Sequence, residues 1–237
     1  MGLTDYTTLS RQQGLMREMR MIANNIANQA TTGYRQQGVI FSEYVRRTDE
    51  AGIVSMSAAQ VRDSSFAQGG LTRTGGQLDL AIEGDGFFLV QTPQGERLTR
   101  NGAFATSSAG DLVTQDGHPV LDSGGAPVFI PPDATDLAIA QDGTLSSNGA
   151  PIGQIGVVSP LDRGAMIREG GVLFRADQGY EPTQAPRVMQ GFVESSNADP
   201  ILQIARMIEV QRAYEMGQNF LQREDERLRG AIKAIIT

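Results

Sequence analysis

Glycine-containing dipeptides interrupt the middle of the sequence at short intervals, and this feature restricts its fold more than any other. In the stretch LDLAIEGDGFFLVQTPQGERLTRNGAFATSSAGDLVTQDGHPVLDSGG, residues 78–125, short apolar runs are separated by Asp-Gly, Asn-Gly and Gly-Gly. Glycine adopts the positive φ angles of the tight turns that join antiparallel strands. VFIPP, LAIAQDGTLSS, IGQIGVVS and RVMQGFVESS continue the pattern. We therefore expect strands and hairpins here rather than helices.

Both ends of the chain have helical periodicity instead. Near the N-terminus the expected seam consists of Leu9, Met16, Ala23 and Ala30, interleaved with Gln12, Met19 and Ile26 and widened by Leu15 and Ile22. Near the C-terminus it consists of Ile204, Met207, Gln211, Tyr214, Gln218, Leu221, Asp225, Leu228, Ile232 and Ile235. Spacings of three and four residues indicate amphipathic helices. Asn197 or Asp199 can cap the second helix, with Pro200 in its first turn.

These patterns predict an α+β fold in which the N- and C-terminal helices pair as a coiled coil, with an inserted all-β, hairpin-rich domain. The expected parts are an N-terminal helical segment (1–36) paired with the C-terminal helix (197–237), a less regular connection (37–64) and a β-rich domain (65–196). In the alternative, the terminal helices lie on the sheet of one compact domain. A two-helix pair covers only part of the apolar surface of its helices, so copies or relatives of the chain must cover the remainder.

Composition and charge restrict the possible functions. The 237-residue chain has no cysteine and a single histidine, His118, which excludes disulfides, thiolate metal sites and multi-histidine metal sites. Its net charge of −7 comprises +3 in residues 1–47, zero in residues 197–237 and therefore −10 in residues 48–196. An acidic body argues against a nucleic-acid partner. The sequence also shows no cleaved secretory signal and no apolar run that could insert into a membrane.

The sequence offers no site for catalysis, cofactor binding or metal binding. Asp85, Asp116 and Asp142 each precede a glycine, but none has the spacing of a calcium loop. His118 precedes Pro119 and is expected in a turn. Glu83 and Asp85 would be the carboxylate pair of a peptidoglycan-cleaving enzyme. Neighbouring acids in a hairpin are far more often solvated turn residues, so we expect no enzyme and no cofactor.

Four stretches resemble the bacterial flagellar rod and hook protein family, in the order in which the family has them. They are IANNIANQATTGYR, GGLTRTGGQLDLAIEGDGFFLV, LTRNGAFATSSAGDLVTQDGHPVL, and QGFVESSNADP followed by MIEVQRAYEMGQNFLQREDERL. The resemblance implies a structural axial subunit of the basal-body rod, which assembles helically and transmits torque for motility. It also implies terminal helices in the inner coiled-coil layer of a tube. Asn197-Ala198 stands where the family often has Asn-Val.

The resemblance further implies the partners and the location of the chain. Its partners would be copies of itself, other rod subunits and the flagellar type III export apparatus. It would lie in the rod, within the periplasmic space, after export without a cleaved signal peptide. The length and the short connection between FSEY and FAQGGL favour a subunit of the proximal rod over one of the distal rod.

The residues expected to contact other subunits lie at the helix seams and where the first helix ends. They are Leu9, Met16, Met19, Ala23, Asn24, Asn25, Ile26, Asn28, Thr32, Gly33, Tyr34, Ile204, Met207, Tyr214, Leu221, Leu228 and Ile232. The three asparagines are unusual because asparagine is a poor residue for a helix interior. Their amides can bind a neighbouring subunit or cap their own helix end, where Gly33 can adopt a left-handed conformation.

Overall fold

A computed structural model describes residues 3–48 and 52–236 of the chain. Within these ranges, the side chains of residues 3–7, 40–48, 52–63, 228, 232, 235 and 236 are not described. The chain divides into two compact units. Unit 1 comprises Met1–Asn28, Gln36–Ser65 and Ala198–Thr237, and unit 2 comprises Gln29–Arg35 and Phe66–Asn197.

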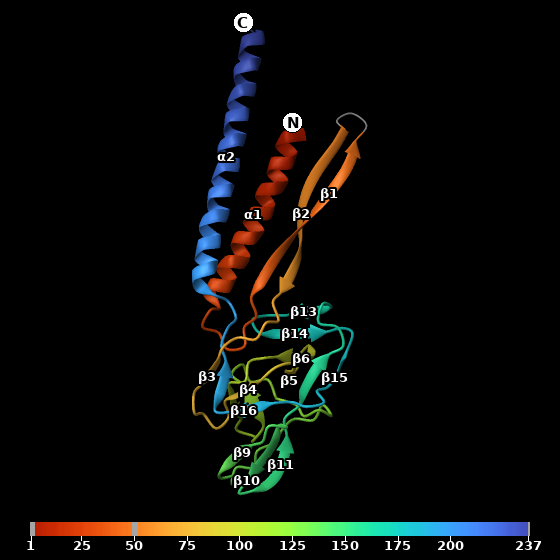
Figure 1. Ribbon diagram of the computed structural model, residues 1–237, viewed down its shortest axis with the longest axis vertical. Coiled ribbons are helices and arrows are strands. Elements are labelled where there is room, and N and C mark those ends of the chain that lie inside the picture. The colour runs from red at the N-terminus through yellow and green to blue at the C-terminus, as the bar shows by residue number, and fades with distance from the viewer. Residues whose placement is uncertain (1–2, 49–51, 237) are drawn as a thin grey trace. The chain divides into compact units, whose positions relative to one another are not determined.

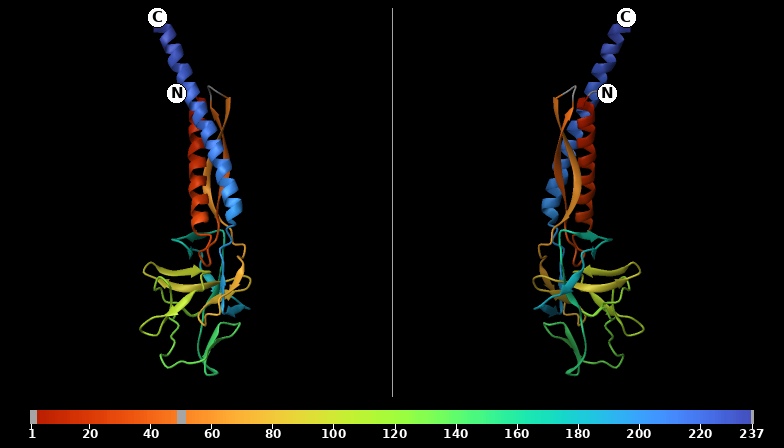
Figure 2. Two further views of the ribbon diagram at one scale, coloured as in Figure 1. Left: turned by 90° about the vertical axis from the view of Figure 1, so that its left-hand side faces the viewer. Right: turned by 90° about the vertical axis from the view of Figure 1, so that its right-hand side faces the viewer.

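Unit 1 combines two helices with one long hairpin. Its elements are α1 (Leu3–Ala27), β1 (Gln37–Thr48), β2 (Gly52–Ser64) and α2 (Pro200–Ile236). Strands β1 and β2 pair antiparallel, with a bulge between Ile40 and Phe41. Helix α1 lies beside both α2 and the hairpin (Figures 1 and 2). The expectation of a less regular connection at residues 37–64 is therefore wrong.

Helices α1 and α2 meet through a small apolar cluster. Its buried members are Leu15, Ile22 and Val210, and Met19, Ile26, Met207, Ala213 and Tyr214 pack against it. Leu9, Met16 and Ile204 of the expected seams are instead 50%, 41% and 51% exposed. Ala30 lies beyond the end of α1. The contact thus uses one side of the expected seam, with Leu15, Met19, Ile22 and Ile26 of α1, and leaves Leu9 and Met16 exposed.

The predicted fold class is consequently wrong. The fold is mostly β, and the two helices in the described residues do not form the expected coiled-coil pairing. Helix α1 has 25 residues and α2 has 37, so much of α2 continues without a matching partner along its length. The hairpin contacts α1 as well. A seven-residue repeat identifies an amphipathic helix, but it does not determine what that helix packs against.

Helix α2 begins at an identifiable cap. Of the two candidates, Asp199 is the cap, because its carboxylate accepts hydrogen bonds from the backbone N–H of Ile201 at 2.8 Å and of Leu202 at 3.2 Å. Pro200 occupies the first helical position, where no backbone N–H is required. The sequence Asp-Pro therefore determines where this helix starts.

Unit 2 consists of short strands. They are β3 (Leu71–Arg73), β4 (Leu80–Ile82), β5 (Phe87–Thr92), β6 (Gly95–Thr99), β7 (Phe104–Thr106), β8 (Leu112–Thr114), β9 (Leu137–Ile139), β10 (Thr144–Ser147), β11 (Ala150–Gln154), β12 (Val157–Pro160), β13 (Met166–Arg168), β14 (Leu173–Ala176), β15 (Tyr180–Pro182), β16 (Val188–Gln190) and β17 (Phe192–Glu194). All described pairs are antiparallel. Residues 78–125 form β4 to β8, as their glycine dipeptides predict.

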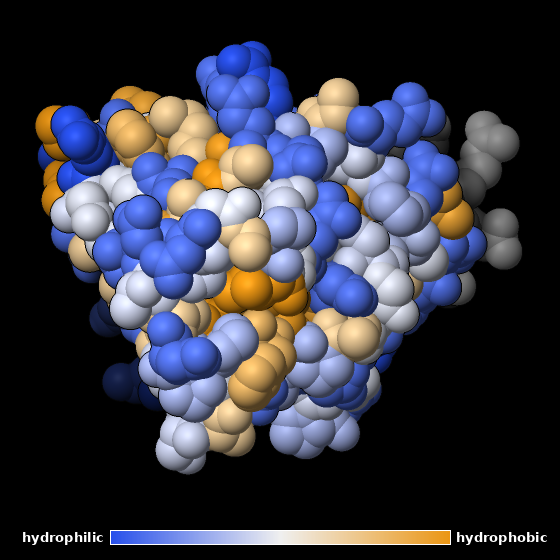
Figure 3. All heavy atoms as spheres, turned by 90° about the horizontal axis from the view of Figure 1, so that it is seen from below, coloured by the Kyte–Doolittle hydropathy of each residue, from blue (hydrophilic) through white to orange (hydrophobic). Residues whose placement is uncertain are grey.

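The sheets of unit 2 are small except for one. A six-stranded sheet has the order β13-β14-β6-β5-β12-β15, and a three-stranded sheet has the order β11-β10-β9. The pairs β16-β4, β17-β3 and β7-β8 complete the unit. Figure 3 shows one end of this unit, where hydrophilic residues cover most of the face and apolar residues form small patches.

Two apolar clusters form the core of unit 2. The larger contains Leu80, Phe88, Val90, Leu145 and Ile155, all of them almost completely buried. The smaller contains Leu89, Leu98 and Phe174. Alternate residues of β5 point to opposite sides of the six-stranded sheet, so Phe88 and Leu89 enter different clusters. The sheet is therefore covered on both faces.

Candidate functional site

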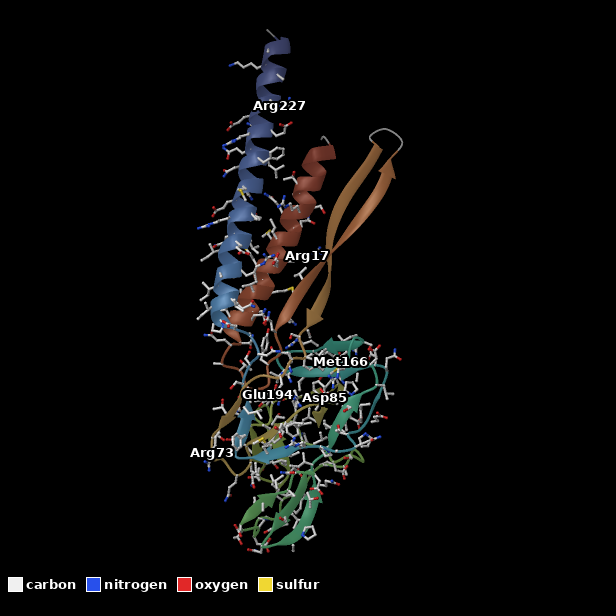
Figure 4. The ribbon with its side chains drawn as sticks, viewed as in Figure 1. Arg17, Arg73, Asp85, Met166, Glu194 and Arg227 are labelled. Carbon is white, nitrogen blue, oxygen red and sulfur yellow. The ribbon has the colours of Figure 1, made fainter. Side chains whose placement is uncertain are left out.

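The helices of unit 1 present a broad apolar surface to solvent. The exposed large apolar residues of these helices are Leu9, Met16, Ile201, Leu202, Ile204, Ile208, Met216 and Phe220. Ile201 is 77% exposed, and Leu202 and Met216 are each 65% exposed. Figure 4 shows side chains projecting from α2 along much of its length. Exposed large apolar residues that gather on the same helices mark surfaces that bind other proteins.

A groove lies between α1 and α2 within this surface. It has a volume of about 340 Å³, and Leu15, Met216 and Phe220 are among its lining residues. Gln12 also lines the groove and is 6% exposed, yet its amide nitrogen has no hydrogen-bond partner among the described residues. A buried donor without an acceptor costs free energy. An occupant with a polar acceptor would therefore complete this groove.

The residues predicted to contact other subunits are divided between exposed and buried positions. Ala23 and Asn24 are exposed, as are Leu9, Met16 and Ile204. Met19, Ile26, Met207, Tyr214 and Leu221 are half-buried, the first four of them in the contact between the helices. The side chains of Leu228 and Ile232 lie outside the described residues. Leu9, Met16 and Ile204 are thus the large apolar members of the predicted set that face solvent.

Asn25 binds other segments of its own unit. It is 1% exposed, and its amide nitrogen donates to the carbonyl oxygen of Gln37 at 2.8 Å. Its side-chain oxygen accepts from the backbone N–H of Gln37 at 2.9 Å, so both polar atoms of the Asn25 amide pair with one residue of β1. The same nitrogen lies 3.1 Å from the side-chain oxygen of Gln203 in α2. One asparagine therefore joins α1, the hairpin and α2.

Asn24 and Asn28 close the end of α1 locally. The Asn28 backbone N–H donates to the carbonyl oxygen of Asn24 at 3.1 Å, and the Asn28 side-chain amide donates to the same oxygen at 2.8 Å. Such bonds satisfy carbonyl groups that the last helical turn leaves without partners. Thr32 is half-buried in the turn that follows.

Gly33 and Tyr34 belong to unit 2. Gly33 has a φ of +69°, and a Cβ added there would lie 2.3 Å from the backbone nitrogen of Asn101. Only glycine fits so close to another backbone segment. Tyr34 is 1% exposed, and the guanidinium of Arg168 lies 4.9 Å from the centre of its ring. Both residues are therefore interior parts of this unit.

A buried arginine–glutamate cluster lies next to these two residues. The carboxylate of Glu194 pairs with Arg35 at 2.5 Å and with Arg100 at 2.8 Å, and these three side chains are at most 3% exposed. It also accepts a hydrogen bond from the backbone N–H of Gly69 at 2.9 Å. Arg35 further donates to the carbonyl oxygen of Ala67 at 2.6 Å. Glu194, labelled in Figure 4, thus connects four separate segments of unit 2.

Burial dominates the electrostatics of this cluster. It lowers the pKa of Arg100 to about 10, while the nearby charge of Glu194 acts in the opposite direction. Burial also lowers the pKa of Arg35 and of Arg168. Both arginines of the cluster remain charged at neutral pH, so they need the Glu194 carboxylate. The sequence analysis missed this cluster; a charged residue within the apolar strand Phe-Val-Glu was its only local signal.

The carboxylates of Glu83 and Asp85 each lie beside an arginine. Glu83 pairs with Arg187 at 3.0 Å and Asp85 pairs with Arg163 at 2.7 Å, so each carboxylate of the hypothetical enzyme has its own arginine. Among the residues searched, no three carboxylate, histidine or cysteine side chains gather as metal ligands would. Neither described helix combines the length and apolar character needed to cross a membrane.

Comparison with known proteins agrees with the sequence motifs. Residues 81–147 match the family model "Flagellar hook protein FlgE/F/G D1 domain", and residues 189–234 match "Flagellar basal body rod FlgEFG protein C-terminal". The flagellar basal-body rod protein FlgF of Caulobacter vibrioides is 38% identical over 97% of this chain and 96% of its own length. FlgF of Mesorhizobium japonicum is 38% identical over 89% of this chain and 88% of its own length.

A relative named FlgG is less similar. The flagellar basal-body rod protein FlgG of Bacillus subtilis is 30% identical over 93% of this chain and 94% of its own length. The likeness is thus greater to these FlgF proteins. The stretches SRQQGLMREMRMIANNIAN and GVLFRAD in the sequence also resemble FlgF. The resemblance inferred from the sequence is confirmed, and the chain belongs to the flagellar basal-body rod protein family.

Proposed function

We propose that the chain is a structural subunit of the flagellar basal-body rod, which acts by binding copies of itself and related rod subunits. The apolar surface of α1 and α2 carries this proposal. Ile201, Leu202 and Met216 are all more than half exposed, and burying such side chains contributes about 1.5–3 kcal/mol each. An isolated subunit gains none of this stabilisation, whereas a helical assembly gains it at every copy.

The interior of unit 1 supports the same conclusion. Among the described side chains, the apolar contact between its helices is the small cluster around Leu15, Ile22 and Val210, and helices obtain most of their stability from tertiary packing. Packing against neighbouring subunits would supply what the isolated chain lacks. The exposed members of the predicted contact set, above all Ile204, Leu9 and Met16, are the residues that we assign to these contacts.

We place the subunit in the proximal rod, within the periplasmic space, and infer export through the flagellar type III apparatus without removal of a signal peptide. Support comes from the greater likeness to FlgF, a flagellar basal-body rod protein. Neither catalysis, nucleic-acid binding nor membrane insertion is part of this function. The proposal thus favours FlgF over the distal-rod alternative and over a peptidoglycan-cleaving enzyme.

Genetic complementation tests the proposal. A strain that lacks the chain should be non-motile, and its purified basal bodies should lack structure beyond the inner-membrane ring. Wild-type protein should restore both properties, whereas Ile204→Asp should restore neither, because assembly would bury an unpaired carboxylate. Asp111→Asn, at the start of a hairpin strand in the acidic unit, is the matched control and should swim normally. Intact rods in the deletion strain would contradict the proposed function.

A further inference from the structure

A pocket on the surface of unit 2 lies beside the pair β3–β17. It has a volume of about 360 Å³ and is lined by Arg73, Gln77, Leu137, Gly191 and Phe192, together with neighbouring residues. Arg73 lies opposite Phe192 in the strand pair. Gly191 has a φ of +77° and contributes no side chain to the pocket. This volume is in the range of small-ligand sites and accommodates an apolar side chain of another protein.

Hydrogen bonds hold the walls of this pocket in place. The side-chain nitrogen of Gln190 donates to the carbonyl oxygens of Gln77 at 2.9 Å and of Leu137 at 3.0 Å. Its side-chain oxygen accepts from the backbone N–H of Ile139 at 3.2 Å. One amide thereby fixes three segments that surround the pocket. A preformed pocket binds a partner without first having to become ordered.

The chemistry of the pocket specifies its occupant. Leu137 and Phe192 provide half-buried apolar walls, and Arg73 at the edge is exposed. In the part of the chain whose side chains are described, no carboxylate pairs with Arg73. The best occupant is therefore an apolar side chain followed closely by a carboxylate.

Unit 2 itself exposes one such element. Its exposed large apolar residues are Phe129, Leu161 and Ile167, and Leu161 is the most exposed of them at 62%. Asp162 follows Leu161, whereas Ile167 is followed by Arg168, which Arg73 would repel. Phe129 stands between apolar residues and has no adjacent charge. Only the turn at Leu161 therefore combines both properties that the pocket requires.

Asp162 is suited to an intermolecular ion pair. One of its carboxylate oxygens accepts from the backbone N–H of Gly164 at 2.8 Å and of Ala165 at 3.3 Å, which fixes the orientation of the side chain. No basic side chain pairs with it in the described part of unit 2. The neighbouring Arg163 is engaged with Asp85 at 2.7 Å. The carboxylate of Asp162 is consequently exposed, oriented and available.

We propose that Leu161 and Asp162 of one copy dock into this pocket on a second copy. Leu161 contacts Leu137 and Phe192, and Asp162 pairs with Arg73. In Figure 4, Arg73 lies at the left edge of unit 2 and Met166, which follows the turn closely, lies near its upper right, so the pocket and the turn are separate surfaces. The contact is therefore head-to-tail and can repeat along an open assembly. This inference rests on the proposed function. It adds that unit 2 binds a second copy of the chain and thereby joins an axial assembly.

Cysteine cross-linking of the purified full-length chain tests this contact, because the natural sequence contains no cysteine. The test variant combines Ala165→Cys on the turn with Gln77→Cys at the pocket, and neither change replaces Leu161, Asp162 or Arg73. The matched control combines Gln77→Cys with Ser108→Cys, an exposed position in another turn. We expect a ladder of disulfide-linked copies that forms about tenfold faster in the test variant than in the control.

Charge variants make the test specific. Asp162→Asn keeps an oxygen for the turn hydrogen bonds and removes only the charge, while Arg73→Gln removes the opposite charge. Each should reduce the cross-linking rate toward the control, and together they should reduce it no further than either alone. Equal rates in test and control variants, or independent effects of the two charge variants, would overturn the inference. Absence of the chain from purified basal bodies would instead contradict the proposed function and leave the cross-linking result unchanged.

Discussion

The two units of this protein differ in where their apolar side chains are covered. Unit 2 buries two apolar clusters on opposite faces of a six-stranded sheet and neutralises its buried arginines with Glu194. Unit 1 buries a small cluster and leaves Ile201, Leu202 and Met216 largely exposed. Unit 2 thus has the interior of an independently stable domain. Unit 1 has the surface of a component that other subunits complete.

The largest loss of stability is expected for Glu194→Ala in unit 2. The change leaves Arg35 and Arg100 buried without their carboxylate, which costs about 3–5 kcal/mol. Denaturant unfolding, combined with hydrogen exchange of unit 2, measures the effect. Asp85→Asn is the control: it removes a partly exposed ion pair worth less than about 1 kcal/mol. A similar loss in both variants would show that burial of the cluster has no special importance.

A smaller loss of stability is expected for Asn25→Ala in unit 1. Asn25 is a buried polar residue that joins three segments of unit 1, as Glu194 joins segments of unit 2. The variant leaves the backbone groups of Gln37 without their side-chain partner, which costs about 1–3 kcal/mol. Hydrogen exchange should accelerate at the start of β1 and at the end of α1. Amides of unit 2 serve as the internal control, and equal acceleration there would contradict the separation of the two units.

The N-terminal cap of α2 should contribute less to the free energy of unfolding than Asn25 does. Asp199→Ala removes the acceptor for the first backbone N–H groups of this helix, at a cost of about 0.5–2 kcal/mol. Circular dichroism at the helix minimum should show earlier melting. Glu215→Ala, at an exposed position within α2, provides the matched comparison. An unchanged melting curve for Asp199→Ala would mean that the start of α2 adds little to the stability of the isolated chain.

The smallest effect on stability is expected for Ile204→Asp, although this variant should abolish swimming. Ile204 is half exposed in the isolated chain, so its replacement should change the free energy of unfolding by no more than about 0.5 kcal/mol. Thermal melting and a motility assay together separate folding from assembly. A strongly destabilised Ile204→Asp protein would mean that Ile204 supports the subunit itself, and the contrast between the units would then be weaker.

Short sequence motifs correctly predicted turns and helix ends, because these features depend mainly on residues close together in the sequence. Asp-Gly, Asn-Gly and Gly-Gly dipeptides marked the strands and turns of residues 78–125, and Asp199-Pro200 marked the start of α2. The long hairpin at residues 37–64 was missed because no such dipeptide marks its turn and its strands mix polar and apolar residues. Its pairing is clear only from the register of β1 and β2.

Properties that depend on distant contacts could not be predicted in the same way. Periodicity identified two amphipathic helices and included Leu15 and Ile22 in the seam, but it also included Leu9 and Met16, which are exposed. Asn25 was correctly singled out as unusual, yet its partners Gln37 and Gln203 belong to segments that the helical pattern does not connect. Nothing in the sequence near Arg35 or Arg100 indicates that both surround one carboxylate.

The position of Glu194 in the chain has a consequence for the order of folding. Arg35 and Arg100 precede it by most of the length of unit 2, so a chain that emerges N-terminus first carries both arginines long before their carboxylate is available. Contacts of such large sequence separation form slowly, because the intervening chain must first be closed into a loop. Unit 2 should therefore complete its folding only after Glu194 has emerged.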